Sequence, residues 1–314
     1  MEKIRKKLII LGSGPAGLTA AIYSARALLE PLLLKGSQPG GQLTLTEDVE
    51  NFPGFSPAIT GTNLIQAMEN QALYCGANIE SDQIEKVELG KMPFQAYGVS
   101  GNVYEADAMI LATGASAKWL NLSNEKKFLG AGVSACATCD GFFFKNQPVF
   151  VIGGGNTAAE EALYLSNLCS QVTIVHRRAE LRAEPLLIKR LKEKKNVHFL
   201  LDHVLEDLSG TDKPLRLEKI KLRNLKTEEE KWHDCAGCFV AIGHKPNTQF
   251  LNNQIAMDSE GYILLKEAGR SFTSVPGIFA AGDVADKHYR QAITAAATGC
   301  MAALDAFHFL QQRD

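Results

Sequence analysis

The stretch "KKLIILGSGPAGLTAAIYSARALLE", residues 6–30, decides the fold class. Its apolar run Leu8–Leu11 leads into Gly12-x-Gly14-x-x-Gly17, and an alanine-rich segment follows. Gly12 permits a tight turn, Gly14 lets the backbone approach a pyrophosphate, and Gly17 lets a helix pack closely on the strand before it. The order strand, glycine loop, helix therefore predicts a dinucleotide site, with a merely tight turn as the alternative.

A second copy of this pattern begins at residue 149, in "VFVIGGGNTAAEEALYLSNL". The run Val149–Ile152 predicts a strand, Gly153-x-Gly155-x-x-Ala158 predicts the loop, and a helix should follow. Two such segments in one chain of 314 residues predict two α/β domains.

The strand expected after the second loop, "QVTIVHRRAELRAE" at residues 171–184, ends in basic residues. At this place an acid binds a ribose 2′-OH, whereas arginine binds a 2′-phosphate. His176, Arg177, Arg178 and Arg182 therefore predict NADP(H) rather than NAD(H). Two charge-assisted bonds to the phosphate would favour NADPH by about 10²- to 10⁴-fold. The alternative is a solvated basic strand end.

The corresponding strand of the first copy departs from the rule. It ends in Lys35 where an acid would be expected, and the glycine-rich "GSQPGGQL" at residues 36–43 follows. We expect that segment to hold an adenosine through backbone contacts, and Lys35 by itself leaves the ligand of the first site unnamed.

Two further strand-to-turn segments favour a flavin for the first site. "MILATGASA" at residues 109–117 and "GIFAAGDV" at residues 277–284 would each bring backbone, and the second a carboxylate, beside a bound dinucleotide. If both belong with the first glycine loop, the second copy is inserted into the first domain. The expected boundaries are 1–117 and 247–314 for the FAD domain and 118–246 for the NADPH domain. The two connections would then form a hinge.

Composition excludes several classes. The chain is 46% hydrophobic and 22% charged with a net charge of −2, so no basic field points to nucleic acid. No run approaches the roughly 18 apolar residues that span a bilayer, and the apolar run after the basic start is too short for a signal peptide. We expect a cytoplasmic protein without membrane or nucleic-acid contacts. Seven cysteines, an odd number, argue against a disulfide framework.

Two pairs of cysteines share the spacing C-x-x-C. Cys136 and Cys139, followed by Asp140, could be a redox pair, half of a zinc site or buried structural cysteines; at a helix start their spacing suits a reversible disulfide. For Cys235 and Cys238 we expect inert packing, with a second redox pair or a zinc site as alternatives. No metal site is expected, because the gap between the two pairs is long for four-cysteine zinc.

The motifs together resemble the low-molecular-weight thioredoxin reductases of bacteria. The resemblance covers essentially the whole chain and rests on "GSGPAG", "GGQLT", "VENFPG", "LATGA", "SACATCDG", "VIGGGNTA", "HRRxxxRAE", "AIGHxPNT" and "AAGDV". It implies an α/β fold of two Rossmann-like, three-layer dinucleotide-binding domains, the second inserted into the first. It also implies FAD, NADPH, a homodimer and thioredoxin as the disulfide substrate.

The resemblance also implies roles for individual residues. Cys139 would face the flavin, Cys136 would exchange with the protein disulfide, and Asp140 would act as general acid and base. The expected FAD contacts are Gly12, Gly14, Pro15, Ala16, Gly17, Gly36, Gly41, Gln42, Leu43, Asn51, Ala112, Thr113, Gly114, Gly282, Asp283, Val284, Arg290, Gln291 and Ala292. The expected NADPH contacts are Gly153, Gly155, Asn156, Thr157, Ala158, His176, Arg177, Arg178, Arg182 and Gly243.

The sequence also allows two other functions. One is the flavoprotein reductase of a peroxidase system, which would carry an additional N-terminal redox domain; we expect none, since the first strand begins close to residue 1. The other is a non-catalytic redox sensor that binds FAD and signals through the cysteine pair. Rapid NADPH oxidation coupled to a protein disulfide would separate the sensor from the reductase.

Overall fold

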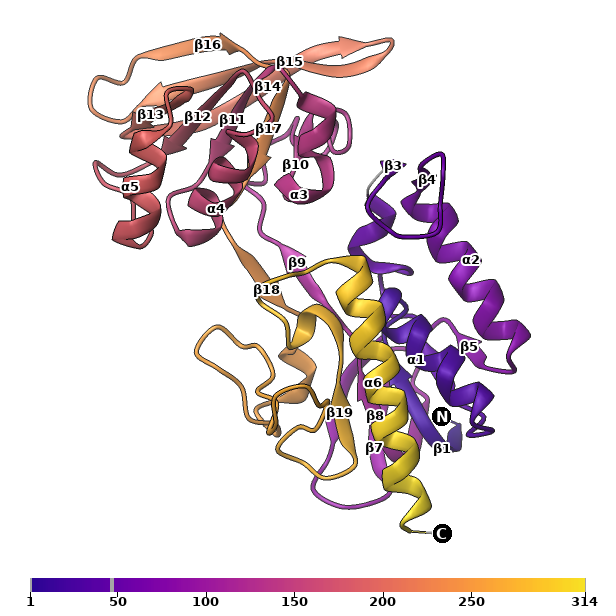
Figure 1. The fold of residues 1–314 in the computed structure, drawn as a ribbon. Coiled ribbons are helices and arrows are strands. Elements are labelled where there is room, and N and C mark those ends of the chain that lie inside the picture. The colour runs from indigo at the N-terminus through magenta and orange to yellow at the C-terminus, as the bar shows by residue number, and fades with distance from the viewer. Residues whose placement is uncertain (1, 46–47, 314) are drawn as a thin grey trace. The chain divides into compact units, whose positions relative to one another are not determined.

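The computed structural model describes residues 2–45 and 48–313, and it divides the chain into two compact units. The first unit consists of Met1–Ser116 and Lys245–Asp314, and the second is Ala117–His244. These limits lie within two residues of the expected boundaries. The connecting strands β9 (Ala115–Ala117) and β18 (His244–Pro246) pair with each other (Figure 1).

The first unit is built on a seven-stranded sheet in the order β5-β2-β1-β8-β7-β6, with β19 paired to β8. Strands β5, β2, β1, β8 and β19 are parallel, as a dinucleotide-binding sheet requires. Its elements are β1 (Lys3–Leu11), α1 (Pro15–Arg26), β2 (Leu32–Leu34), η1 (Gly41–Leu45), β3 (Asp48–Val49), β4 (Ile59–Thr60), α2 (Gly61–Tyr74), β5 (Asn78–Glu80), β6 (Ile84–Glu88), β7 (Phe94–Gly98), β8 (Val103–Leu111), η3 (Gln249–Leu251), β19 (Ile278–Ala280), η4 (Gly282–Val284) and α6 (Ala292–Gln311).

Strand β1 explains why this sheet forms. Its residues Leu8 and Ile10 pack against helices α1 and α6, whereas Ile9 and Leu11 face the opposite side of the sheet. All four are at most 2% exposed, and burying each contributes roughly 1.5–3 kcal/mol. The strand begins at Lys3, five residues before the apolar run, because its first half pairs with β8.

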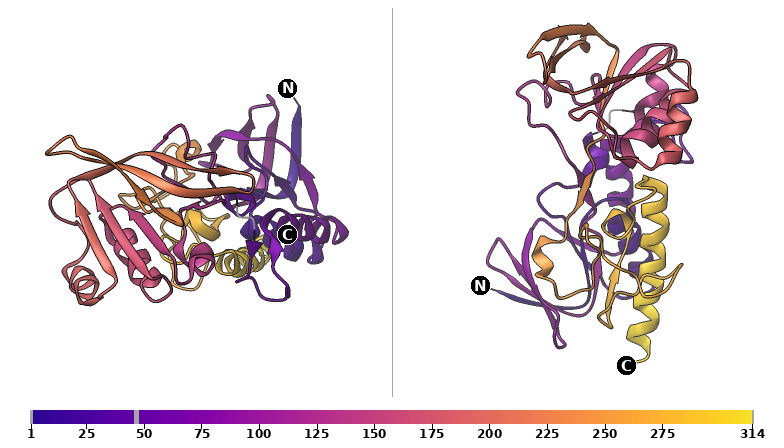
Figure 2. Two further views of the ribbon diagram at one scale, coloured as in Figure 1. Left: turned by 90° about the horizontal axis from the view of Figure 1, so that it is seen from above. Right: turned by 90° about the vertical axis from the view of Figure 1, so that its left-hand side faces the viewer.

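The second unit has a five-stranded parallel sheet in the order β10-β17-β11-β12-β13 and a three-stranded antiparallel sheet, β14-β15-β16. Helices α4 and α5 lie on one face of the parallel sheet and the antiparallel sheet on the other, which gives three layers (Figure 2). Its elements are β10 (Val133–Ser134), α3 (Ala137–Asp140), η2 (Gly141–Phe144), β11 (Pro148–Ile152), α4 (Asn156–Leu165), β12 (Gln171–His176), α5 (Pro185–Glu193), β13 (Val197–Leu201), β14 (His203–Asp212), β15 (Leu215–Asn224), β16 (Glu230–Asp234) and β17 (Gly237–Val240).

Helix α6 departs from one expectation. The sequence predicts no apolar run long enough to span a membrane, yet α6 is long and apolar enough by length and composition. The difference arises because the many alanines of α6 raise its mean hydropathy, although the helix also contains Asp305 and His308. Its buried alanines, among them Ala302 and Ala306, pack in the core of the first unit with α1, as expected for the core helix of an α/β domain.

Candidate functional site

The first glycine loop lies between β1 and α1. Gly12 has a φ of 109°, and its N–H donates to the Leu34 carbonyl at 2.9 Å. A methyl group on Gly12 would collide with the carbonyl oxygen of Ala112, and one on Gly17 with that of Gly12. Both glycines are therefore needed so that loop, strand and helix can approach.

Open space lies on the other side of this loop. A methyl group on Gly14 would meet nothing nearer than the Gly40 carbonyl oxygen at 3.9 Å, and one on Gly41 nothing nearer than Gly14 Cα at 3.8 Å. Ser13 joins the two glycine-rich segments, because its hydroxyl accepts the Gly40 N–H at 2.9 Å and donates to the Lys35 carbonyl at 3.1 Å. Glycine spacing alone did not single out Ser13. The two segments form a backbone cradle of the kind that a pyrophosphate requires.

The turn after β8 is held by a residue from the far end of the chain. The Thr113 hydroxyl donates to the Asn247 carbonyl at 2.8 Å, and the Asn247 amide Nδ2 donates to the Thr113 carbonyl at 2.9 Å. The Asn247 N–H also donates to the Gly114 carbonyl at 3.0 Å. Asn247 is thus a positioning residue; the "PNT" segment contains it, but no spacing rule assigned it a role.

The turn after β19 contains Asp283, a carboxylate of the first unit. The Gly282 N–H donates to the Thr298 hydroxyl of α6 at 2.9 Å, which fixes the turn against the helix. Burial, assisted by Asp286, raises the pKa of Asp283 to about 7, while Arg290 opposes the shift. A carboxylate held in this way gains from a hydroxyl donor, which the ribityl chain of a flavin offers.

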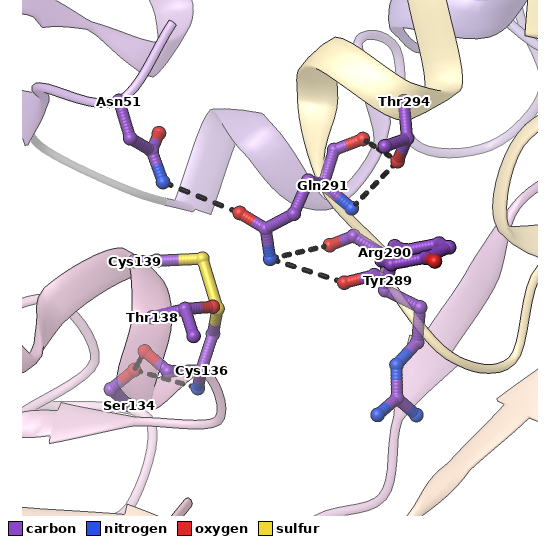
Figure 3. Close-up of a disulfide and its surroundings, with 9 residues drawn as sticks. All are labelled: Asn51, Ser134, Cys136, Thr138, Cys139, Tyr289, Arg290, Gln291 and Thr294. Carbon is purple, nitrogen blue, oxygen red and sulfur yellow. Dashed lines mark hydrogen bonds between the residues drawn. A yellow bond between two sulfur atoms is a disulfide. The ribbon is translucent and has the colours of Figure 1, made fainter. Parts of the chain in front are cut away.

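Asn51 and Gln291, 240 residues apart, meet in the first unit (Figure 3). The Asn51 amide Nδ2 donates to Gln291 Oε1 at 3.3 Å, and Gln291 Nε2 donates to the carbonyls of Tyr289 and Arg290 at 3.2 Å each. Arg290 adopts a left-handed φ of 49°, and Gln291 with Thr294 forms a capping box at the start of α6. The expected flavin contacts Asn51, Arg290 and Gln291 are therefore gathered at one helix N-terminus.

The remaining expected FAD residues occupy the same loops. Pro15 is the first residue of α1, and the Gly36 N–H donates to the Asp82 carbonyl at 3.0 Å. Gly41, Gln42 and Leu43 lie in η1, and Val284 in η4. The backbone N–H groups of the glycine loops, the small residues beside them and the carboxylate of Asp283 fit FAD. The other positions are Ala16 in α1, Ala112 after β8, and Ala292 at the first turn of α6.

The second glycine loop lies between β11 and α4, and His176 packs on it. A methyl group on Gly154 would collide with the His176 ring, whereas one on Gly155 would meet nothing within 4 Å. His176 is 5% exposed, and its Nε2 is a buried nitrogen without a partner among the described residues. A buried polar atom of this kind beside a phosphate-binding loop fits a nucleotide ligand.

Three arginines surround this loop. Arg177, Arg178 and Arg182 are exposed, and the Arg182 N–H donates to the Gly154 carbonyl at 2.6 Å. Burial and then the charges of Arg182, Arg178 and Arg177 lower the pKa of His176, which favours its neutral form. The second unit thus concentrates positive charge where the sequence predicts a 2′-phosphate. Of the other expected residues, Asn156, Thr157 and Ala158 begin α4, and Gly243, with a φ of 102°, accepts the Lys118 N–H at 3.0 Å.

One expected cofactor contact already has a protein partner. Asn156 Nδ2 donates to Glu184 Oε1 at 3.1 Å, and the Glu184 N–H donates to Asn156 Oδ1 at 2.9 Å. Asn156 therefore joins the start of α4 to the start of α5, and no spacing rule identified Glu184.

Cys136 and Cys139 form a disulfide at the start of α3 (Figure 3). Their Cα atoms are 5.3 Å apart, and Cys136 is the N-cap residue of the helix. The Cys136 N–H donates to the Ser134 hydroxyl at 3.0 Å, and the N–H groups of Cys139 and Asp140 both donate to the Cys136 carbonyl. A helix N-terminus stabilises a thiolate, which favours exchange.

Asp140 directly follows this disulfide. Burial raises the pKa of its carboxyl, and a hydrogen bond from Ser134 opposes the shift in part. A raised pKa favours the protonated form of a carboxyl, which is the form that a general acid uses.

Cys235 and Cys238 are free thiols in the core of the second unit. Burial raises the pKa of Cys235 to about 12 and that of Cys238 well above its usual value. Such thiols carry almost no thiolate at neutral pH, in line with the expected inert packing. Within residues 2–45 and 48–313 no group of histidine, cysteine or acidic side chains is placed to hold a metal ion.

The chain is similar to known proteins over nearly its whole length. The model of the pyridine nucleotide-disulphide oxidoreductase family matches residues 6–299. The thioredoxin reductase of Rickettsia felis is 54% identical over 310 residues, which cover 99% of this chain and 100% of the relative. The chain belongs to the thioredoxin reductase family. The resemblance found in the motifs is thereby confirmed.

Other members of the family agree. The thioredoxin reductase of Escherichia coli O157:H7 is 51% identical over 311 residues, covering 97% of this chain and 96% of the relative. The solved structure of the thioredoxin reductase from Giardia duodenalis superposes with a TM-score of 0.93 at 38% identity, covering 98% of this chain and 99% of that one. These findings confirm the predicted fold class of two Rossmann-like α/β domains, and family membership implies FAD and NADPH.

Proposed function

We propose that this chain is an NADPH-dependent thioredoxin-disulfide reductase. The observation that carries the proposal is the Cys136–Cys139 disulfide at a helix N-terminus, in the same compact unit as the arginine-flanked glycine loop. The names of its close relatives support thioredoxin as the disulfide substrate. Overall, NADPH, one proton and oxidised thioredoxin become NADP⁺ and thioredoxin with two thiols.

The two units divide the cofactors between them. The first unit, with the cradle of Gly14 and Gly41 and the carboxyl of Asp283, would hold FAD, whereas the second unit, with Arg177 and Arg178, would hold NADPH. FAD, when bound, accepts hydride from NADPH and supplies two electrons to the disulfide. This assignment follows from charge, because FAD carries no 2′-phosphate for the arginines to bind.

The cysteines transfer the electrons to the substrate by thiol–disulfide exchange. Once the pair is reduced, the Cys136 thiolate attacks one sulfur of the thioredoxin disulfide and the other sulfur leaves as a thiolate. The Cys139 thiolate then attacks Cys136 Sγ, which releases the second thioredoxin thiolate and restores the disulfide. Asp140 would supply a proton during this cycle, because it directly follows the cysteine pair and burial raises the pKa of its carboxyl.

Two exposed phenylalanines follow the disulfide closely along the chain of the second unit. Phe142 and Phe143, in η2 directly after Asp140, are 56% and 41% exposed. Exposed aromatic side chains next to a reactive disulfide suit contact with a protein substrate, because apolar contact supplies affinity while the sulfur atoms exchange.

We also infer a cytoplasmic homodimer without nucleic-acid or membrane contacts. Large apolar side chains remain exposed on helices α1, α2 and α6 of the first unit, and α1 packs in one core with both other helices (Figure 1). Tyr23, Leu73, Tyr74 and Leu304 are 44%, 48%, 92% and 47% exposed. A second copy of the chain would cover such exposed apolar side chains, and a near-neutral net charge of −2 does not oppose self-association. Sedimentation should give twice the chain mass; a monomer would contradict the inference.

The reductase proposal is tested by turnover. The purified protein should have flavin absorbance, and it should oxidise NADPH rapidly only when oxidised thioredoxin is present. The Cys136→Ser variant should lose this activity, whereas Cys75→Ser, which changes a free cysteine of the first unit, should retain it. Flavin-containing protein that does not reduce thioredoxin would refute the proposal and favour a redox sensor.

A further inference from the structure

Lys35, the residue that departs from the dinucleotide rule, forms an ion pair. Its Nζ lies 2.6 Å from Oε1 of Glu69, which belongs to helix α2. The two side chains are 20% and 17% exposed, so the pair is largely withdrawn from water. A carboxylate from another element thus contacts the side chain that follows β2, where the dinucleotide rule expects an acid.

The end of β2 is joined to the first glycine loop by backbone bonds. The Gly12 N–H donates to the carbonyl of Leu34, the last residue of β2, at 2.9 Å, and the Ser13 hydroxyl donates to the Lys35 carbonyl at 3.1 Å. Next to Lys35, a methyl group on Gly36 would meet nothing within 4 Å, so open space begins there. In a dinucleotide fold the adenosine ribose lies at this end of the second strand.

We propose that Glu69 is the acidic residue that binds the adenosine ribose of FAD in the first unit, and that its ion pair with Lys35 excludes 2′-phosphorylated dinucleotides from that site. This inference rests on the proposed placement of FAD in the first unit. It assigns a binding role to a residue of α2 that lies 34 positions after Lys35 in the chain.

The chemistry follows from charge. A carboxylate oxygen accepts a hydrogen bond from a ribose hydroxyl, whereas it repels a phosphate. A lysine without a partner here would attract the 2′-phosphate of NADPH, which the same protein must bind elsewhere. Glu69 neutralises that ammonium group, so the end of β2 offers a 2′-phosphate no net positive charge.

The second unit provides the contrast within the same chain. There Arg177 and Arg178 are exposed at the end of the corresponding strand β12. The end of β2 carries a paired lysine and the end of β12 carries exposed arginines, so the two sites differ in the charge that they offer to a 2′-phosphate. This difference would keep FAD and NADPH in separate sites.

The test measures how tightly the holoenzyme retains FAD. At low protein concentration, free FAD is separated by ultrafiltration and measured by its fluorescence, which gives a dissociation constant. Glu69→Gln should weaken FAD retention by about 10- to 100-fold, the effect expected for one hydrogen bond to a charged group. Glu88→Gln, which removes the carboxylate of the exposed Lys86–Glu88 pair in the same unit, is the matched control and should retain FAD like the parent.

A competition arm tests specificity. Adenosine 2′,5′-bisphosphate should displace FAD from Glu69→Gln at concentrations at least about 10-fold lower than from the parent, since Lys35 is then free to bind the 2′-phosphate. Adenosine 5′-monophosphate, which lacks that phosphate, should show no such gain. If the concentration needed to displace FAD falls equally for both nucleotides, the ion pair does not exclude the 2′-phosphate and that part of the proposal is wrong.

The Lys35→Met variant distinguishes FAD binding by Glu69 from a purely structural role of the ion pair. It removes the ion pair but keeps the carboxylate, so FAD retention should stay within about threefold of the parent, well below the loss expected for Glu69→Gln. If Lys35→Met releases FAD as strongly as Glu69→Gln, the pair is only structural and the proposal is wrong. If Glu69→Gln does not fold, Lys35→Met is compared with the parent: it should retain FAD within about threefold and need more adenosine 2′,5′-bisphosphate for displacement, because the carboxylate is then unneutralised. A loss of FAD of about 10-fold or more, or easier displacement by the bisphosphate, would overturn the proposal. Parent protein that is purified without FAD would instead contradict the proposed function.

Discussion

Replacing Arg177 and Arg178 together by alanine should convert a strong preference for NADPH into a weak one. Both side chains are exposed at the end of β12, and their charges act on His176, which packs against the second glycine loop. A hydrogen bond between charged groups contributes about 1.5–3 kcal/mol, and exposure to water places these two at the lower end. Two bonds of about 1.5 kcal/mol correspond to roughly a 100-fold increase in the KM for NADPH.

The assay compares NADPH and NADH in steady-state thioredoxin reduction at two salt concentrations. The KM for NADH should change by less than about twofold, because NADH has no phosphate for these arginines to bind. Exposed charges are screened over about 8–10 Å at physiological ionic strength, so the parental KM for NADPH should rise with salt more steeply than that of the variant. Arg190→Ala, which removes an exposed arginine of α5 in the same unit, is the control and should behave like the parent.

One result would refute this reasoning. If the KM for NADPH and the KM for NADH rise equally in the double variant, the arginines support the fold of the loop and do not bind a 2′-phosphate. Urea unfolding of the variant, measured in parallel, would then show a lowered free energy of unfolding.

Three further predictions concern other parts of the molecule. Cys136→Ser should abolish thioredoxin reduction while NADPH still bleaches the flavin, since hydride transfer does not need the disulfide; parental turnover in this variant would remove the pair from the mechanism. Asp283, whose pKa is raised to about 7, binds more protons in the folded state, so the free energy of unfolding of FAD-free protein should fall as the pH rises from about 4 to 7. Asp283→Asn should flatten that dependence and weaken FAD binding, and an unchanged slope would contradict the assignment. Cys235 and Cys238 should resist alkylation in native protein at pH 7 and react in urea, because their raised pKa values leave little thiolate; rapid native labelling would contradict their inert role.

The sequence by itself determined the local units of this protein. A strand, glycine loop and helix in succession, as in residues 6–30, depend on periodicity and on backbone freedom at single positions such as Gly12, which neighbours in the chain already specify. The cysteine pair at the start of α3 and the arginines after β12 are also short-range patterns, and the chemistry of each residue type suggested its role.

Only the tertiary structure decided which distant residues meet. Asn51 bonds to Gln291 and Asn247 to Thr113 because segments from both ends of the chain fold into one unit around β8 and β19. Strand β1 begins at Lys3 because β8 supplies backbone partners there, although the apolar pattern begins only at Leu8. Glu69 reaches Lys35 from a helix that no spacing rule connects to β2. The physical reason is that hydrogen bonds and ion pairs act over a few ångströms in space, whereas sequence patterns report only neighbours along the chain.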